Sequence, residues 1–387
     1  MIFLRQTAYR SIIVGVSYTH RTIREAIFVK RVYNFSAGPG VISEEVLLSA
    51  QKDLLCYGNS GMSVMEMSHR SSDYTPIIER AEALLREILG LSDSYKVLFL
   101  QGGASLQFAQ VPMNLLTGSG SADYIDSGIF AKKALDEVRK YGKINVVASS
   151  AAENYTRIPD WNEKDFDPHA DYFHITTNNT IYGTRFSTLP EVGNVPLVAD
   201  MSSNILAEEY DFSKFGLVYA GAQKNLGPSG VTVVIIREDL LGKAMDITPS
   251  VLNYTTMVKE GSMYNTPTTF GIYIAMLTFE WVLRQGGLSA MSQLAKKRAQ
   301  ILYDAIDAST VFRGVARKED RSFMNVTFLS GNEEIDNRFV SEAKKEGIVN
   351  IKGHRSVGGI RASIYNAMPV EGVLALADLI KRFEKNV

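Results

Sequence analysis

The stretch KVLFLQGGASLQFAQVPMNLL, residues 96–116, joins a short apolar run to a helical repeat through two glycines. The run from Lys96 to Leu100 has the length and composition of a buried strand. Gly102-Gly103 interrupts it, and the apolar spacing from Ser105 to Leu116 predicts a helix. A strand that turns directly into a helix is the building unit of α/β folds.

The same alternation continues on both sides of this unit. Thr75-Pro76 predicts the N-cap and first residue of a helix that extends to Leu89, with Gly90 as its C-terminal cap. Amphipathic segments such as 131–141 separate several further strand candidates. These candidates are the apolar runs 144–148, 172–176, 195–199, 217–220 and 231–236. We therefore predict an α/β fold with a mainly parallel sheet.

The chain is predicted to have three parts, the first of which is an N-terminal extension. A helix is expected after Thr266-Pro267, and Gly286-Gly287 marks a boundary beyond it. We place a large ligand-binding domain at 46–292. A smaller α+β domain is expected to combine 32–45 with 293–387.

Residues 1–31 differ from the rest because they contain six Lys and Arg residues and a single acid, Glu25. A basic, acid-poor leader is typical of a transit peptide. The alternatives are a terminal extension outside the fold and a start codon placed too far upstream. We predict an extension that is disordered or a leader. The expected location is the cytoplasm, with organellar import as the alternative.

Composition narrows the classes of function. The 387 residues include 41 Lys and Arg against 42 Asp and Glu, so there is no basic surplus of the kind that binds nucleic acid. No segment approaches the roughly 20 apolar residues of a membrane-spanning helix. The single cysteine, Cys56, excludes an internal disulfide and a cysteine-based zinc cluster. We predict no metal site, and neither nucleic acid nor membrane as a partner.

Lys224 follows the apolar run 217–220 in the segment AGAQKNLGPSG, residues 220–230. Ligands of open α/β sheets bind beyond the carboxyl ends of the strands. A lysine held there among small residues can be desolvated, which favours the neutral, nucleophilic amine of a Schiff-base lysine. On its own, such a lysine also fits an ordinary surface loop.

Asp200 ends the apolar run 195–199, 24 residues before Lys224. In pyridoxal 5'-phosphate (PLP) chemistry a carboxylate keeps the pyridine nitrogen protonated, so that the ring can accept electrons from the substrate's α-carbon. The alternative is a carboxylate that only caps the following turn. As a pair, the aspartate and the lysine indicate a PLP site.

Several strings of the sequence resemble the phosphoserine aminotransferases, a family of class-V, fold-type-I PLP enzymes. The resemblance extends from about residue 32 to the C-terminus and implies a large domain with a seven-stranded, mainly parallel sheet and a smaller domain. The matching strings are YNFSAGP (33–39), MSHRS (67–71), QGG (101–103), VPMNLL (111–116), VADMSS (198–203), the Lys224 segment, YNTP (264–267) and GHRSVGGIRASIYN (353–366).

The resemblance implies PLP as the cofactor and a role for each matching residue. Lys224 would hold the cofactor covalently and then carry the proton that leaves the substrate. Asp200 would pair with the ring nitrogen and Thr180 with the phenolic oxygen, while Phe130 would stack on the ring. The cofactor phosphate would be bound at a helix start by Ala104, Ser105 and Gln223 and, from a second subunit, by Asn265 and Thr266.

The resemblance also implies a homodimer with shared active sites and substrates that carry two anionic groups. Arg361 would bind the α-carboxylate as a bidentate fork. His354 and Arg355 would bind the substrate phosphate together with His69 and Arg70 of a second subunit. The implied reaction transfers the amino group of L-glutamate to 3-phosphohydroxypyruvate, which gives O-phospho-L-serine and 2-oxoglutarate in serine biosynthesis. A related four-carbon substrate of vitamin B6 synthesis is a further implied possibility.

Three other functions fit the sequence less well. A dehydrogenase needs Gly-x-Gly-x-x-Gly after its first strand, and residues 102–105 do not match that pattern. A cysteine desulfurase needs a catalytic cysteine, whereas Cys56 lies in an apolar segment and is expected to pack as a small hydrophobe. A non-catalytic relative would be expected to lack Lys224 or Asp200, and both are present.

Overall fold

The computed structural model describes residues 31–386 of the chain. From Tyr33 onward, these residues form one compact unit. The leader or extension predicted at 1–31 lies outside the described residues, Arg31 excepted.

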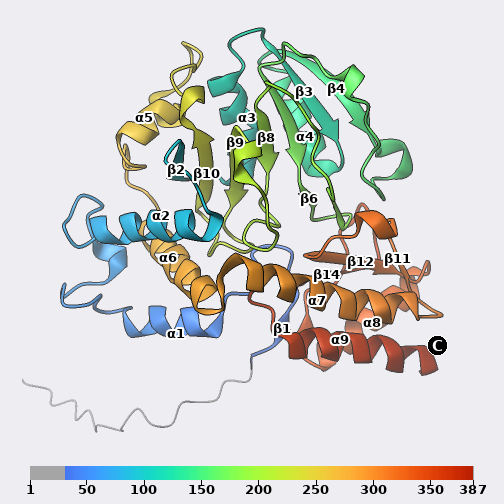
Figure 1. The fold of residues 1–387 in the computed structure, drawn as a ribbon. Helices are drawn as coiled ribbons and strands as arrows, with labels where there is room; N and C mark the ends of the chain where they lie inside the picture. The colour runs from blue at the N-terminus through green and yellow to red at the C-terminus, as the bar shows by residue number, and fades with distance from the viewer. Residues whose placement is uncertain (1–30, 387) are drawn as a thin grey trace, which may run out of the picture. The chain divides into compact units, whose positions relative to one another are not determined.

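A seven-stranded sheet forms the centre of this unit (Figure 1). Strand β10 is antiparallel to both of its neighbours, and all other neighbouring strands are parallel, which confirms the predicted α/β fold with a mainly parallel sheet. In spatial order the strands are β2 (Tyr95–Leu100), β10 (Thr232–Arg237), β9 (Leu217–Gly221), β8 (Leu197–Asp200), β5 (Tyr172–Thr176), β3 (Ser121–Asp126) and β4 (Lys143–Ser149).

Helices cover both faces of the sheet, because successive strand residues point to opposite sides. In β5, Phe173 and Ile175 belong to the apolar core on one side and Tyr172 to the core on the other. The first core includes residues of α1 (Glu44–Lys52), α2 (Thr75–Leu89) and α6 (Thr269–Arg284). The second includes residues of α3 (Gly103–Leu115), α4 (Ile129–Val138) and α5 (Tyr254–Lys259).

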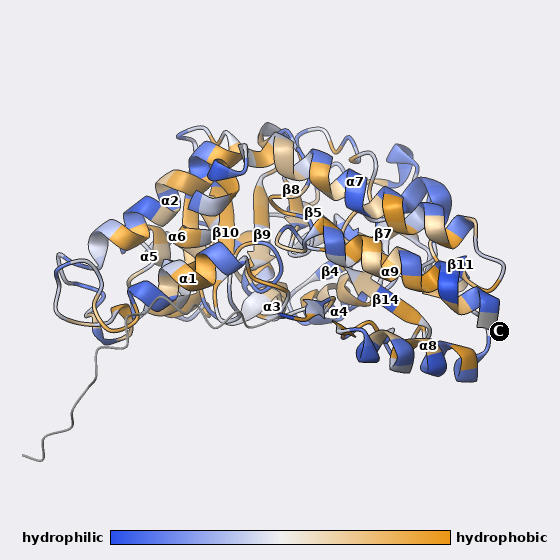
Figure 2. Cartoon of the chain, turned by 90° about the horizontal axis from the view of Figure 1, so that it is seen from below, coloured by the Kyte–Doolittle hydropathy of each residue, from blue (hydrophilic) through white to orange (hydrophobic). Residues whose placement is uncertain are grey.

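The C-terminal part has its own apolar core, which includes Phe35 from the beginning of the described chain. Figure 2 shows hydrophilic and hydrophobic residues alternating along α8 and α9, whereas β10 of the sheet is hydrophobic. The elements are β1 (Tyr33–Asn34), α7 (Gly287–Asp307), β11 (Arg313–Gly314), β12 (Asn325–Leu329), α8 (Glu333–Lys345), β13 (Ile348–Val349), β14 (Ile360–Ser363) and α9 (Val370–Phe383). The predicted domain limit at 292/293 falls inside the continuous helix α7, and the division stays a prediction.

Some element boundaries differ from the predicted ones for local reasons. The N-cap of α2 is Tyr74 rather than Thr75, because the carbonyl of Ser71 already accepts the N–H of Thr75 at 3.1 Å. Strand β8 begins at Leu197 instead of 195, because Pro196 has no N–H to donate to a neighbouring strand. Helix α3 begins two residues before the predicted Ser105.

Strand β3 has no counterpart among the predicted apolar runs, because its sequence SADYID contains two aspartates. The structure buries Asp123 completely and provides partners for its carboxylate. The side-chain amide of Asn145 donates to it at 3.0 Å and the backbone N–H of Asp167 at 2.7 Å. Buried polar groups with such partners are tolerated inside a sheet.

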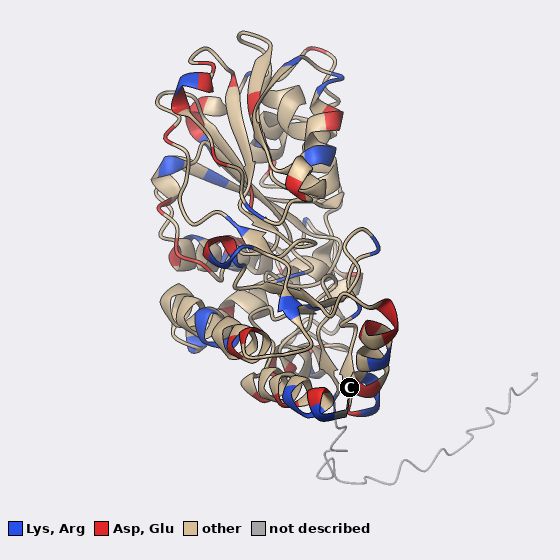
Figure 3. Cartoon of the chain, turned by 90° about the vertical axis from the view of Figure 1, so that its right-hand side faces the viewer, with Lys and Arg blue, Asp and Glu red and all other residues tan. Residues whose placement is uncertain are grey.

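Four features of the described residues bear on function. None of the helices in residues 31–386 is both long and apolar enough to cross a membrane. Lys and Arg residues are interspersed with Asp and Glu residues over the helices (Figure 3). Within the same residues, no three His, Cys, Asp or Glu side chains are grouped so that they could hold a metal ion. Cys56 is exposed, so the prediction that it packs as a hydrophobe is wrong.

Candidate functional site

A cavity of about 420 Å³ opens at the carboxyl ends of β5, β8 and β9. Fourteen residues were predicted to form the site, and the structure brings ten of them to this one cavity. They come from segments far apart in the sequence, because the strand ends and the C-terminal part meet here. The ten are Ala104, Ser105, Phe130, Thr180, Asp200, Gln223, Lys224, His354, Arg355 and Arg361.

Lys224 lies in the turn that follows β9, and its side chain is partly buried. Its Nζ donates a hydrogen bond to Oγ1 of Thr180 at 2.8 Å. Burial lowers the pKa of Lys224 from 10.5 to about 8; Asp200 opposes this shift and Arg361 adds to it. A substantial fraction of the amine is therefore neutral near physiological pH, as a nucleophilic lysine requires.

Asp200 is the last residue of β8 and is only 5% exposed. One carboxylate oxygen accepts the backbone N–H of Ser202 at 2.9 Å. Burial raises the pKa of Asp200, while Lys224 and Ser202 act in the opposite direction. A cationic group placed against this carboxylate would favour its ionised form.

The N-terminus of α3 lies at the wall of the cavity. Gly102, the N-cap, has a φ of 89°, a conformation that glycine adopts without strain. The N–H groups of Ala104 and Ser105 are in the first helical turn and have no acceptor within the helix. Together with the partial positive charge of the helix end, they are suited to an anion such as a phosphate. The side chain of Gln223 lines the same cavity.

Phe130 is the second residue of α4 and presents its ring to the cavity. The Nζ atom of Lys224 lies 5.6 Å from the centre of this ring. A planar group bound between Lys224 and Asp200 would therefore have an aromatic neighbour. Thr176, also in the lining, has a buried hydroxyl with no hydrogen-bond partner in residues 31–386.

His354, Arg355 and Arg361 enter the cavity from the C-terminal part. Nδ1 of His354 lies 2.8 Å from Oγ of Ser356. Burial lowers the pKa of His354, and the nearby cations Arg361, Arg355 and Lys133 lower it further, which favours the neutral imidazole. Burial also lowers the pKa of Arg361, which makes no ion pair with any residue in 31–386.

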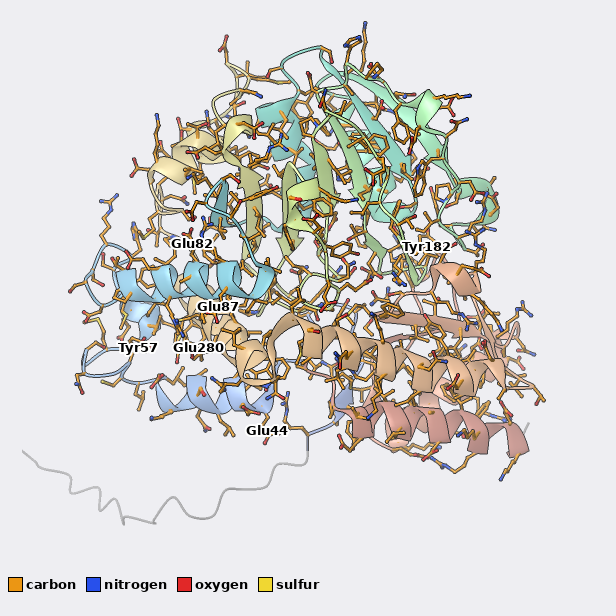
Figure 4. The ribbon with its side chains drawn as sticks, in the orientation of Figure 1. Glu44, Tyr57, Glu82, Glu87, Tyr182 and Glu280 are labelled. Atoms are coloured by element: carbon orange, nitrogen blue, oxygen red, sulfur yellow. The ribbon has the colours of Figure 1, made fainter. Side chains whose placement is uncertain are left out.

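Several hydrogen bonds hold this C-terminal part against the sheet part, and two of them involve β12, the strand beside Arg361. The hydroxyl of Thr327 in β12 donates to the carbonyl of Tyr182 at 2.8 Å, and Tyr182 lies where the two parts meet (Figure 4). The side-chain amide of Asn178 donates to Oδ1 of Asn325 at 2.8 Å. Because Thr327 is in register with Arg361 in the neighbouring strand, these contacts also set the position of Arg361.

Four predicted residues do not line this cavity. His69 and Arg70 precede α2, and Nε2 of His69 is buried without a hydrogen-bond partner among the described residues. Asn265 lines a separate cavity of about 180 Å³. The carbonyl of Thr266 accepts a hydrogen bond from Gln101 at 3.0 Å. Within a single chain, these residues therefore lie outside the cavity of Lys224.

The cavity also contains residues to which no role was assigned from the sequence. They include Lys133, Thr176, Asn178, Ser202 and Ser203. Ser202 and Ser203 lie two and three residues after Asp200, and Asn178 belongs to a polar stretch after β5. Their position after the ends of strands could therefore have identified them as site residues. The signal for Lys133 is its spacing from Phe130, because residues three apart share one face of a helix.

The chain matches the family model of class-V aminotransferases over residues 32–376. This match, together with the sheet and the lysine at its edge, defines the class: a PLP-dependent aminotransferase of class V.

Similar proteins and solved structures show to which family of class-V aminotransferases the chain belongs. Phosphoserine aminotransferase from Bacillus cereus is 52% identical over 356 residues, which cover 92% of this chain and 99% of the relative. The Pseudomonas aeruginosa enzyme is 51% identical with the same coverage. A phosphoserine aminotransferase structure from Bacillus circulans subsp. alkalophilus matches with a TM-score of 0.89 at 48% identity, over 92% of this chain and 99% of that one. A PLP-bound phosphoserine aminotransferase from Trichomonas vaginalis matches with a TM-score of 0.87 at 38% identity, over 91% and 100%. The chain therefore belongs to the phosphoserine aminotransferase family.

Proposed function

We propose that this protein transfers the amino group of L-glutamate to 3-phosphohydroxypyruvate, which gives 2-oxoglutarate and O-phospho-L-serine. The observation that carries the proposal is that Lys224 and Asp200 share one cavity with the cations Arg355 and Arg361. The lysine and the aspartate suit transamination, and the cations suit substrates with an anionic group at each end.

The residues of the cavity fit PLP. The free N–H groups of Ala104 and Ser105 suit its phosphate, and Asp200 suits its ring nitrogen. The unpartnered hydroxyl of Thr176 provides an additional polar contact for a bound group. When bound, PLP supplies the electron sink that makes the hydrogen on the substrate's α-carbon acidic.

The protein's own groups bind the substrate and move its proton. Nζ of Lys224 accepts the proton from the α-carbon, since its lowered pKa leaves a neutral amine available. Thr180, 2.8 Å from Nζ, holds the amine in place. Arg361 binds the α-carboxylate that both amino donors share, and His354 and Arg355 receive the group at the other end of the substrate.

A second copy of this chain is proposed to complete the cavity with its His69, Arg70, Asn265 and Thr266. Large apolar side chains are exposed in the segments around these residues, which lie on one side of the molecule (Figure 1, left). They are Leu54, Leu55, Met65, Val251 and Tyr264. Exposed apolar groups of this kind mark an interface. Sedimentation equilibrium should give the mass of two chains of 42.8 kDa each, and a monomer would contradict the shared site.

An absorbance titration of the purified protein tests the proposed reaction. The bound cofactor should give a yellow absorbance band, which O-phospho-L-serine should bleach and 2-oxoglutarate should restore. Bleaching by phosphoserine should occur at much lower concentrations than bleaching by L-serine or L-alanine, because these lack the phosphate that the cations bind. If L-alanine bleached the band at the same concentrations as O-phospho-L-serine, the proposed substrate would be wrong. If no yellow band formed after addition of PLP, the proposed PLP-dependent transamination would be wrong.

Replacing Arg361 with lysine is expected to weaken the binding of every substrate. A lysine keeps the charge but cannot form the bidentate fork, so the dissociation constants of L-glutamate and O-phospho-L-serine should both rise about 10-fold. The amplitude of the cofactor band at each amino-acid concentration gives these constants. Arg313→Lys, in an exposed position on β11, is the matched control. An unchanged dissociation constant for L-glutamate would show that Arg361 does not bind the α-carboxylate.

A further inference from the structure

Lys133 is a cation of the cavity wall that the proposed mechanism does not use. It lies one helical turn after Phe130 on α4, and both residues line the cavity. Its Nζ is 5.6 Å from the centre of the Phe130 ring, the same distance as Nζ of Lys224. The exposed side chain of Lys133 therefore borders the space in which a substrate would lie.

The charge of Lys133 is not neutralised by its neighbours. Lys132 pairs with Asp136 at 2.5 Å, and Lys140 pairs with Glu137 at 2.6 Å. Lys133, by contrast, makes no ion pair with any residue in the described range 31–386. Among the described residues that line the cavity, Asp200 is the only carboxylate, and it is buried at the end of β8.

Three cations of the cavity act on the same imidazole. Arg361, Arg355 and Lys133 each lower the pKa of His354, in addition to the effect of its burial. Lys133 therefore lies close enough to the C-terminal loop to share a ligand with His354 and Arg355. Because α4 belongs to the sheet part, this ligand would be held from both sides of the cavity.

We propose that Lys133 determines specificity for a doubly charged phosphoryl group at the distal end of the substrate. This inference rests on the proposed function, because it concerns how the same cavity distinguishes its two amino donors. At neutral pH a phosphoryl group carries about −1.5 to −2 charges, whereas the side-chain carboxylate of glutamate carries one. The Coulomb attraction of a single lysine is therefore up to about twice as strong for the phosphoryl group.

The test compares two ligands in three variants. In Lys133→Met the dissociation constant of O-phospho-L-serine should rise roughly fivefold and that of L-glutamate only about twofold. Lys133→Arg should restore both constants, because it keeps the charge. Lys132→Met is the matched control, since Lys132 lies on the same helix but does not line the cavity. Inhibition of the glutamate reaction by inorganic phosphate should weaken in Lys133→Met, which tests anion binding without the amino acid.

The outcomes separate this inference from the proposed function. If the unmodified protein does not prefer phosphoserine to L-serine, the proposed function fails. If it does prefer phosphoserine, but Lys133→Met changes both constants by the same factor or leaves both unchanged, the role of Lys133 is wrong. An equal loss in Lys132→Met would also overturn it, because the effect would then come from the general charge of α4.

Discussion

Replacing Lys224 with alanine should lower the rate of transamination by roughly 10⁴-fold, the upper range for loss of a positioned acid–base group. The substitution removes both the amine that accepts the α-proton and the nucleophile that receives the cofactor. Because the side chain is only partly buried and makes one hydrogen bond, to Thr180, the fold should persist. The rate is measured as formation of 2-oxoglutarate, with circular dichroism to verify folding. Lys132→Ala is the control. A wild-type rate in Lys224→Ala would show that Lys224 is not the catalytic lysine.

The pH dependence of cofactor uptake gives a second readout for Lys224. Only the neutral amine reacts with an aldehyde, and burial lowers the pKa of this lysine from 10.5 to about 8. The neutral fraction therefore increases as the pH rises through about 8, and the rate at which cofactor-free protein takes up PLP should increase with it. A midpoint near 10.5 would show that the amine is not desolvated.

Replacing Asp200 with asparagine should lower kcat by about 10²–10³-fold, comparable to the loss of one preorganised electrostatic contact. Asparagine keeps the shape of the side chain but not its charge, so a cationic ring nitrogen would lose its buried counter-ion. The change should appear mainly in kcat, since Asp200 lies at the inner end of the cavity and Arg361 binds the substrate. Single-turnover kinetics with O-phospho-L-serine separate the two effects.

The matched control for this substitution is Asp123→Asn. Asp123 is also buried in the same sheet, but its carboxylate accepts hydrogen bonds from Asn145 and Asp167 outside the cavity. Its replacement should lower the thermal stability and leave kcat unchanged. If Asp200→Asn had only this effect, Asp200 would be a structural carboxylate that caps the following turn.

The sequence allowed most of the large sheet to be predicted, because its strands are short runs of mainly apolar residues. Strand β3 was not placed, since burial of Asp123 depends on Asn145 and Asp167, which lie elsewhere in the chain. The order of the strands and the antiparallel direction of β10 also depend on contacts between distant segments. No local pattern encodes them.

The same distinction applies to the site. Lys224 and Asp200 could be found because they directly follow apolar runs, and the remaining residues because their strings resemble a known family. Lys133 neither follows a strand nor belongs to one of these strings. Its spacing from Phe130 places both residues on one face of a helix, but that face borders a cavity only when the C-terminal part packs opposite it. The roles of His69, Arg70, Asn265 and Thr266 depend on a second chain and stay predictions.

The pairing of β1 with β13 has a consequence for the order in which a newly made chain can fold. All strands of the large sheet have been synthesised once Arg237 has emerged from the ribosome. Tyr33 and Asn34 are made before every strand of the large sheet, but they have no partner strand until Ile348 and Val349 follow. Until then the C-terminal core that buries Phe35 is incomplete, and the nascent chain exposes apolar surface of the kind that chaperones protect. Arg361 emerges later still, so the substrate-binding part of the cavity is completed only near the end of synthesis.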